Sequence, residues 1–127
     1  ATLAESVPQI GAPEAWDSGL TGEGVRVAVL DTGIDADHPD LADAVVEAED
    51  FTGSGNTDDG QGHGTHVAAT ILGDGSASDG RYRGVAPDAE LVVGKVLDDD
   101  GFGQESWILA GMEWAAENAS VVNMSLG

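Results

Sequence analysis

The hydrophobic positions of the chain fall into short runs separated by loops rich in glycine and polar residues. Residues 25–30 form an apolar, β-branched run after two glycines, and this pattern predicts a buried strand. Residues 45–51 predict a second and more exposed strand. Residues 91–97 and 121–124 predict two more apolar strands, so the chain carries the strands of a sheet.

Two of the intervening segments have the spacing of helices that are apolar on one side. Residues 63–72 form the first and end at Gly73, and residues 104–118 form the second. The positions on these apolar faces are Val67, Ala68, Ile71, Trp107, Ile108, Gly111, Met112 and Ala115. Strands separated by helices are typical of βαβ units, so we expect an α/β fold with a parallel β-sheet, flanking helices and right-handed crossovers.

Length and composition narrow the class of protein and the partners to be expected. The chain has 127 residues, of which 41% are hydrophobic and 19 are glycine, so it forms one globular domain at most. Its 24 acidic and 4 basic residues give a net charge of −20, which repels phosphate backbones and anionic membrane surfaces. We therefore expect neither nucleic acid nor a membrane as a partner. There is no cysteine, so the fold does not use disulfides.

Both ends of the chain bear on its processing. Residues 1–10 lack the basic and apolar regions of a secretory signal, so we expect the chain to be either cytosolic or already processed. Residues 121–127 form an apolar, strand-like segment without a polar tail. Because an uncovered apolar strand at a sheet edge promotes aggregation, we expect more protein to continue beyond Gly127.

Asp31 and His63 are the first candidates for chemistry. Asp31 directly follows the predicted strand at 25–30, where the functional groups of open α/β sheets gather. His63 begins the predicted helix at 63–72 between two glycines, which allow other backbone to approach closely. A carboxylate that binds one imidazole nitrogen leaves the other free to take a proton from a nucleophile. On residue types alone, a structural aspartate and a packed or solvated histidine are the more frequent explanation.

Two cation-binding sites are alternatives to a catalytic role for Asp31 and His63. His63 and His66 lie three residues apart on the predicted helix, but the neighbouring glutamate of the metalloprotease helix motif is absent, which argues against zinc. An acidic α/β domain of another family would instead bind a small ligand or cation through Asp98, Asp99 and Asp100. Their spacing does not match an EF-hand loop, and a solvated turn explains them better.

Longer segments of the sequence resemble those of a known family. Residues 31–35 (DTGID) and 38–41 (HPDL) resemble the aspartate segment of the subtilisin-like serine proteases, or subtilases. Residues 63–68 (HGTHVA) resemble the histidine segment of the same family. Residues 6–13 and 109–115 are most similar to secreted actinobacterial members, which mature by losing a signal and a propeptide. Further matches follow in the family's order at residues 84–87, 95–97, 100–101, 106–108 and 123–127.

The resemblance covers nearly the whole chain. It implies a subtilisin-like three-layer α/β/α fold that is incomplete in this chain, with residues 1–127 as the N-terminal part of the catalytic domain. It implies a serine-type endopeptidase in which Asp31 orients His63, and in which His63 acts as general base and acid. His66 would be a helix residue near the site with a structural role. On the same ground we expect a secreted, extracellular protein.

The resemblance also implies contacts with an extended polypeptide substrate. One run of residues would pair with one edge of the substrate strand, and a second run would pair with the other edge and form a wall of the primary specificity pocket. The first run is Gly101, Phe102 and Gly103, and the second is Ser125, Leu126 and Gly127. Glu105 stands where members often have a tyrosine, so a more distant pocket would favour basic side chains. A solvated glutamate at a helix start explains it equally well.

The family's nucleophile does not occur in this chain. It lies in a Gly-Thr-Ser-Met-Ala segment, which residues 1–127 lack together with the oxyanion-hole asparagine before it, and Ser125 is no substitute. We therefore expect no peptidase turnover from the isolated chain. Three explanations stay open: a segment of a longer enzyme, one product of a backbone nick, or a non-catalytic homologue that binds peptide in the same cleft. The expected partners are a polypeptide substrate, the remainder of the catalytic domain and, before maturation, a propeptide.

The resemblance implies no cofactor for catalysis. Asp40 matches a calcium ligand of some members, but residues 73–83 do not resemble their calcium-binding loop. Calcium takes about six to eight oxygen ligands, so one carboxylate does not make a site. A structural calcium ion is therefore compatible with Asp40 but not supported by the loop after Gly73, and we expect a purely structural Asp40.

Overall fold

A four-stranded parallel sheet forms the centre of the molecule. The computed structural model describes residues 1–127. The strands are β1 (Arg26–Asp31), β2 (Val45–Asp50), β3 (Glu90–Lys95) and β4 (Val121–Asn123), and they lie in the order β2-β3-β1-β4. Each strand coincides with one of the apolar runs of the sequence, so the predicted parallel sheet is confirmed.

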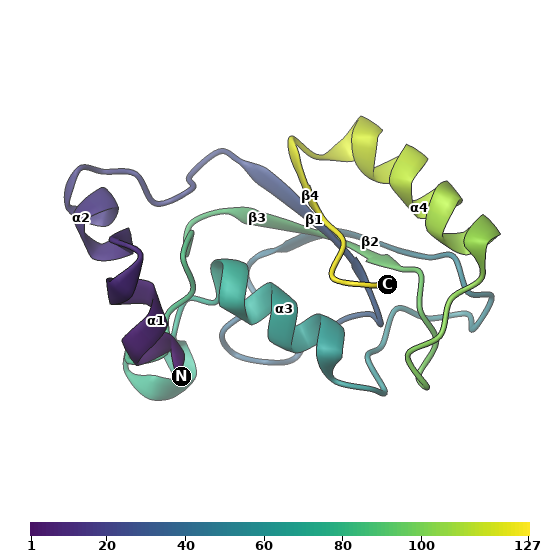
Figure 1. The fold of residues 1–127 in the computed structure, drawn as a ribbon, viewed down its shortest axis with the longest axis horizontal. Coiled ribbons are helices and arrows are strands. Elements are labelled where there is room, and N and C mark those ends of the chain that lie inside the picture. Colours follow the sequence, from purple (N-terminus) through teal and green to yellow (C-terminus); the bar gives the residue numbers. More distant parts are fainter.

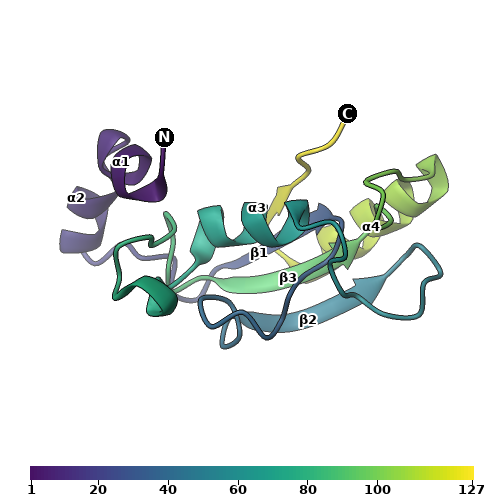
Figure 2. The same ribbon diagram turned by 90° about the horizontal axis from the view of Figure 1, so that it is seen from below.

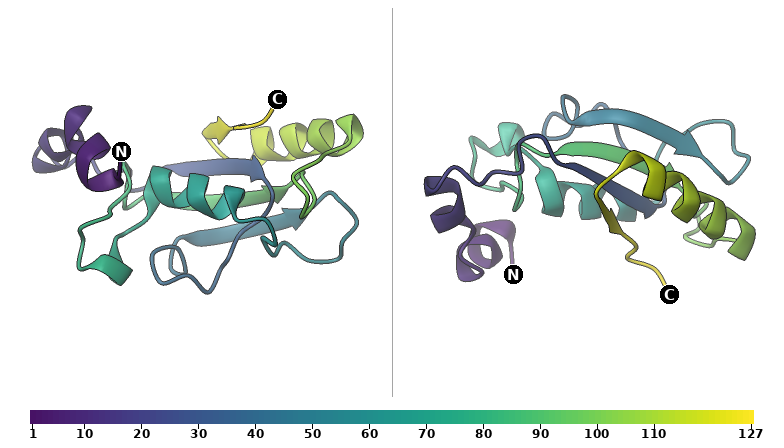
Figure 3. Two further views of the ribbon diagram at one scale, coloured as in Figure 1. Left: turned by 60° about the horizontal axis from the view of Figure 1, so that its bottom comes forward. Right: turned by 90° about the horizontal axis from the view of Figure 1, so that it is seen from above.

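Helices cover both faces of this sheet (Figure 1). α3 (His63–Leu72) lies on one face and α4 (Glu105–Asn118) on the other, as the two views of Figure 3 show. Because side chains alternate along a strand, Val29 of β1 packs in the core under α3, whereas Leu30 packs in the core under α4. The predicted α/β/α layering is therefore confirmed, and its two cores meet along β1 and β3.

Two short helices that were not predicted precede the sheet. α1 (Leu3–Gln9) and α2 (Ala12–Asp17) lie beyond the ends at which the strands begin, as Figure 2 shows. Pro8 inside α1 and the shortness of both helices hide them from a search for helical periodicity. The Trp16 indole N–H donates a hydrogen bond of 2.8 Å to the Val85 carbonyl and ties α2 to the body of the protein.

The observed strand ends differ little from the predicted ones. β1, β2 and β4 end within one residue of the expected positions. β3 ends at Lys95, earlier than expected, because the N–H groups of Val96 and Leu97 turn to the Asp31 carbonyl, at 3.0 and 3.1 Å. The loop after α3 contains one 3-10 turn, η1 (Ser76–Ser78), and lies largely on the surface, as expected.

α4 turns a slightly different face to the sheet than its apolar pattern predicts. Met112 is 41% exposed, so its expected place in the apolar face is wrong. Trp114 packs there instead, with its ring centroid 5.6 Å from that of Phe51 in an edge-to-face arrangement. Gly111 is buried, and a Cβ atom at this position would collide with the Val96 side chain. The absence of a side chain at Gly111 thus allows α4 to approach the sheet.

Replacing Gly111 with alanine tests this close approach. In an exposed helix the change would stabilise by about 1 kcal/mol. Here the added methyl group meets Val96, so we expect the free energy of unfolding to fall by about 1–3 kcal/mol in urea unfolding experiments. Ala116→Gly, on the exposed side of α4, is the control and should cost about 1 kcal/mol through helix propensity alone. A more stable Gly111→Ala protein would show that α4 lies farther from the sheet.

Candidate active site

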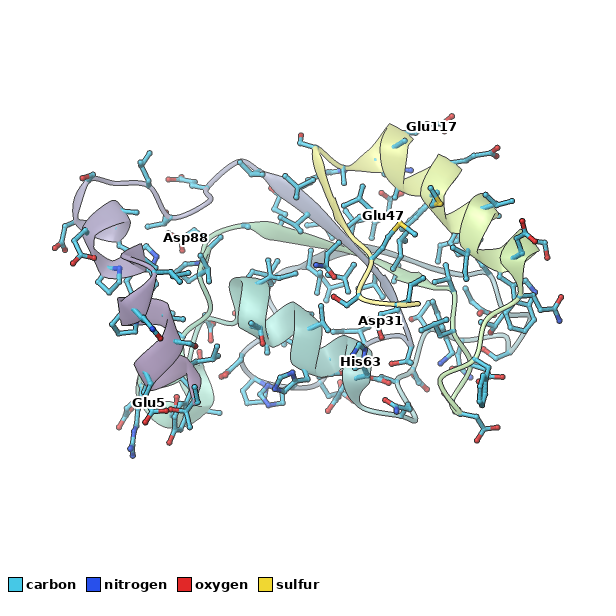
Figure 4. The ribbon with its side chains drawn as sticks, in the orientation of Figure 1. Glu5, Asp31, Glu47, His63, Asp88 and Glu117 are labelled. Carbon is cyan, nitrogen blue, oxygen red and sulfur yellow. The ribbon has the colours of Figure 1, made fainter.

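Asp31 and His63 meet at the carboxyl end of the sheet (Figure 4). Asp31 is the last residue of β1, and its side chain is 1% exposed. His63 is the first residue of α3, and its side chain is 47% exposed. The distance from His63 Nδ1 to Asp31 Oδ1 is 2.7 Å, which is a short hydrogen bond. The contact expected from the sequence is therefore present.

This geometry orients the imidazole to act as a base. The carboxylate accepts the Nδ1 proton and so holds the neutral ring in the tautomer whose Nε2 is free to accept a proton. Asp31 Oδ1 also accepts the Thr32 N–H at 2.8 Å, whereas its Oδ2 is buried without a hydrogen-bond partner in the chain. A buried carboxylate so close to His63 would stabilise the imidazolium that forms when Nε2 takes a proton.

The backbone at the start of α3 sets the position of His63. Gly62 has a φ of 99°, a conformation that residues with side chains rarely adopt. The His63 N–H donates to the Gln61 side-chain oxygen at 2.8 Å, which satisfies one of the free N–H groups of the helix start. Gly64 lies so close to the Gly33 carbonyl that a Cβ atom would collide with it. Small residues at these positions thus bring the helix start against the end of β1.

Asp59 links the two segments that carry the pair. Its Oδ1 accepts hydrogen bonds from the Thr32 hydroxyl at 2.7 Å and the Gly62 N–H at 2.8 Å. Its Oδ2 accepts the N–H and the hydroxyl of Thr65, at 2.9 and 2.6 Å. The Thr32 hydroxyl in turn accepts the Gly64 N–H at 2.9 Å. Thr32, which follows Asp31, and Gly64, which follows His63, are therefore joined through the Thr32 hydroxyl group.

Asp59 is ionised because of these contacts. Burial raises the pKa of Asp59, but hydrogen bonds from Thr65, Gly62 and Thr32 outweigh it and lower the pKa to about 2. Asp59 was not predicted as a site residue, because it lies in a loop rich in glycine, asparagine and aspartate. The available signal was its position shortly before a helix start, where a carboxylate can accept the free N–H groups.

A cleft of about 290 Å³ opens beside His63. Glu105 is exposed on the first turn of α4 and does not line this cleft. Leu97 and Ile108 add apolar lining and were not predicted as substrate contacts. All the other predicted substrate contacts do line it, namely Gly101, Phe102, Gly103, Ser125, Leu126 and Gly127.

The two walls of the cleft present unpaired backbone groups. The N–H groups of Gly103, Ser125, Leu126 and Gly127 donate no hydrogen bond within the chain. The turn before Gly103 is closed separately, because the Asp98 carboxylate accepts the Phe102 N–H at 3.0 Å. Free backbone donors on facing segments can hold an extended peptide as an added strand.

The alternative cation sites are not assembled. His66 lies one turn further along α3, in a depression formed with residues 1–3 and Tyr82, and it does not line the cleft beside His63. The Asp98 carboxylate closes its own turn, and the Asp99 carboxylate binds the Lys95 ammonium at 2.8 Å. The chain contains no group of three His, Asp or Glu side chains placed to hold a metal ion.

The surroundings of Asp40 do not fit a calcium site. Its Oδ1 accepts the Ala77 N–H at 2.7 Å, and its carbonyl oxygen accepts the Asp74 N–H at 3.1 Å. The loop after α3 therefore offers hydrogen-bond donors to Asp40, whereas calcium requires further oxygen ligands around it. These two contacts join Asp40 to the loop after α3, and a purely structural Asp40 stays a prediction.

Asp59→Asn tests the network around the pair. The amide nitrogen cannot accept the Thr65 hydrogen bonds, so we expect the free energy of unfolding at about pH 7 to fall by about 1–2 kcal/mol. Because the folded-state pKa is depressed, this contribution is complete above the ordinary value of 3.8 and is lost as the pH falls towards about 2. The free energies of unfolding of the wild type and of Asp59→Asn should therefore converge as the pH falls from 3.8 towards about 2.

Urea unfolding across this pH range measures the difference. Asp58→Asn removes the same charge from an exposed neighbour and should show a small effect at every pH. A stability difference between wild type and Asp59→Asn that stays constant down to about pH 2 would contradict the assignment.

Comparison with known proteins agrees with this geometry. The model of the subtilase family matches residues 22–127. The chain is 44% identical over 132 residues to the major intracellular serine protease of Bacillus subtilis (strain 168), a match that covers 98% of this chain and 41% of that protein. It is 48% identical over 131 residues to subtilisin E of the same organism, covering 98% of this chain and 33% of that protein. It is 49% identical over 131 residues to the alkaline protease of Alkalihalobacillus alcalophilus, covering 99% of this chain and 33% of that protein.

The chain thus spans about a third to two fifths of the length of these relatives. The family model nevertheless covers all of the chain from residue 22 onward, including β1, the start of α3 and both walls of the cleft. The fold is the parallel α/β sheet expected for that family. The chain belongs to the subtilase family.

Proposed function

We propose that this chain supplies the aspartate and histidine of a serine endopeptidase triad, together with one part of the substrate cleft. The observation that carries the proposal is the 2.7 Å contact between Asp31 Oδ1 and His63 Nδ1 beside that cleft. Two of the relatives named above are called proteases, and the matches of all three cover 98–99% of this chain. The chain is the N-terminal part of the catalytic domain in this proposal.

The proposed reaction uses the pair as a proton shuttle. His63 Nε2 takes the proton of a serine hydroxyl as the serine oxygen bonds to the carbonyl carbon of the substrate. The same proton then passes to the amine nitrogen as the C–N bond breaks, and water repeats the sequence to release the acyl group. Asp31 remains ionised throughout, because its role is to orient the ring and to stabilise the imidazolium.

The nucleophile and the oxyanion hole belong to polypeptide other than residues 1–127 in this proposal. No Gly-Thr-Ser-Met-Ala segment occurs in the chain, and the pair alone cannot form an acyl-enzyme. The remainder of the catalytic domain, in the same or a nicked chain, is therefore a required partner. A propeptide is a further partner before maturation, by the resemblance to members that mature in this way.

The proposed substrate is an extended polypeptide. The unpaired N–H groups of Gly103, Ser125, Leu126 and Gly127 lie on the two walls of the cleft. The carbonyl oxygens of a peptide placed between the walls would accept hydrogen bonds from these N–H groups, so that the peptide forms a central strand. The alternative, a protein that binds peptides in this cleft without cleaving them, uses the same contacts but has no serine nucleophile.

Export from the cell is part of the proposal, on the resemblance of residues 6–13 to secreted members. No helix of the chain has the length and apolar character needed to cross a bilayer. The relatives include the intracellular protease named above as well as subtilisin E. Immunodetection in separated medium and cell fractions of the source culture distinguishes the two locations, and protein confined to the cells would contradict export.

Alanine substitution of the pair tests the proposed activity. In the complete gene product that contains this segment, we expect Asp31→Ala and His63→Ala to lower kcat for peptide hydrolysis by about 10⁴-fold, because the base is lost or misoriented. The matched controls are Asp35→Ala and His66→Ala, which remove an exposed aspartate and an exposed histidine nearby. They should retain activity within about threefold, since neither side chain contacts the pair.

The isolated 127-residue chain should show no turnover in the same assay. A complete product that binds peptides but does not cleave them would favour the binding alternative. Full activity in His63→Ala would exclude the proposed mechanism.

Glu105 is expected to influence which peptides are preferred. It is exposed on the first turn of α4, next to the cleft wall that ends at Gly103. We expect peptides with a basic residue four positions before the cut to be cleaved about two- to fivefold faster than neutral ones at low salt, and Glu105→Gln to abolish the preference. Glu113→Gln, farther along the exposed face of α4, is the charge-matched control. If the preference for basic residues survives in Glu105→Gln, another group of the protein is responsible for it.

A further inference from the structure

Lys95, the last residue of β3, carries the only buried positive charge of the chain. Four basic residues are present, and the other three are exposed arginines. The Lys95 side chain is 1% exposed. Removing an ammonium group from water is costly unless its hydrogen bonds and its charge are compensated. The partners of Lys95 therefore indicate what its burial achieves.

Three oxygen atoms occupy the three donors of the Lys95 ammonium. Nζ lies 2.6 Å from the Thr32 carbonyl oxygen, 2.7 Å from the Asp58 carbonyl oxygen and 2.8 Å from Asp99 Oδ1. The hydrogen bond from Lys95, aided by one from the Gly60 N–H, holds the pKa of Asp99 below its usual value. Asp99 is therefore the ionised counter-charge, and no donor of the ammonium is left free.

The three oxygens belong to three different segments of the candidate site. Thr32 follows the aspartate of the pair, and Asp58 lies in the loop that leads to α3. Asp99 lies in the turn that continues into the cleft wall at residues 101–103. One buried group thus contacts the end of β1, the approach to the histidine and the base of the cleft wall.

Lys95 also shares a face of the sheet with Asp31. The two residues are paired in register on the neighbouring parallel strands β1 and β3, so their side chains project to the same side. Val29 and Val93, two positions earlier on each strand, both lie in the core under α3. α3 carries His63, and Figure 4 shows the labelled Asp31 and His63 together at this end of the helix. The ammonium, the carboxylate and the imidazole therefore occupy one layer of the molecule.

We propose that Lys95 is a positioning residue for the Asp31–His63 pair. Its ammonium holds the end of β1 and the loop before α3 at one point, so that Asp31 Oδ1 and His63 Nδ1 stay within hydrogen-bonding distance. A methionine would fill similar space, but it has no donors with which to fix the three oxygens. The catalytic meaning of this role rests on the proposed function, whereas the geometric role does not.

Proton NMR of the complete gene product tests the geometric role. An imidazole N–H that is hydrogen-bonded to a carboxylate gives a resonance far downfield of the amide protons, and its absence in His63→Gln assigns it to His63. We expect Lys95→Met to remain folded and to lose this resonance or broaden it beyond detection. A folded Lys95→Met protein with the wild-type resonance would overturn the inference.

Two controls separate positioning from general effects. Leu91→Ala creates a cavity on the same strand and the same core face, so it should lower Tm but keep the resonance. Arg26→Met removes a positive charge at the opposite end of the sheet and should also keep it. Loss of the resonance in Leu91→Ala as well would reduce the role of Lys95 to general stability.

Asp99→Ala tests the positioning role of Lys95 if Lys95→Met does not fold. The Asp99 side chain is 65% exposed, so its removal leaves the core intact while the ammonium loses one acceptor and its counter-charge. We expect a shifted or weakened His63 resonance in this variant, and an unchanged resonance would overturn the inference.

Peptide hydrolysis by the complete gene product separates this inference from the proposed function. If the wild type is active, we expect Lys95→Met to lower kcat by about 10- to 100-fold through misplacement of the pair, with Arg26→Met unchanged. An active wild type whose Lys95→Met variant is equally active contradicts the role of Lys95 alone. An inactive wild type contradicts the proposed function, and the NMR result then still decides the geometric role.

Discussion

The hydrogen bond between Asp31 and His63 places a buried carboxyl group at the centre of the site, in a chain that already carries a net charge of −20. An anion in the interior is tolerated only where donors and positive charge surround it. Here the Thr32 N–H and the imidazole bind one oxygen of Asp31, and the Lys95 ammonium is buried on the same face of the sheet. These groups lie where the ends of β1 and β3 meet the start of α3.

The parallel sheet brings these groups together. β1 and β3 are paired in register from Arg26 and Glu90 to Asp31 and Lys95, so both strands deliver their last side chain at the same level. The start of α3 lies against this edge, where its free N–H groups attract the Asp59 carboxylate. Charged groups that would be costly elsewhere in the core thus gather at the edge where strand ends and a helix start coincide, and only Asp31 Oδ2 among their buried side-chain atoms has no hydrogen-bond partner in the chain.

Local sequence determines the elements of the fold far better than the network around the site. β-Branched runs and a helical repeat suffice to place the four strands, α3 and α4, because these signals are contained in each segment. The Asp31–His63 contact was expected from a family resemblance and not from spacing, since its partners lie 32 residues apart. For Asp59, the sequence offered only its position shortly before a helix start. The role of Lys95 was not predictable in this way, because two of its three partners are backbone carbonyl groups, which carry no sequence signature.

The contacts that orient the pair all lie between the end of β1 and the turn after β3, within a segment that folds around one end of the sheet. Folding of this segment therefore fixes the orientation of the imidazole. Under the proposed function, the entropy lost in orienting the base would then already be part of the folding equilibrium. The walls of the cleft differ in this respect, because the N–H groups of Gly103 and of residues 125–127 are left unpaired. Under the proposed function, hydrogen-bonded groups hold the base, and unpaired backbone N–H groups line the cleft where a peptide would bind. These two roles then fall to separate parts of the same edge of the sheet.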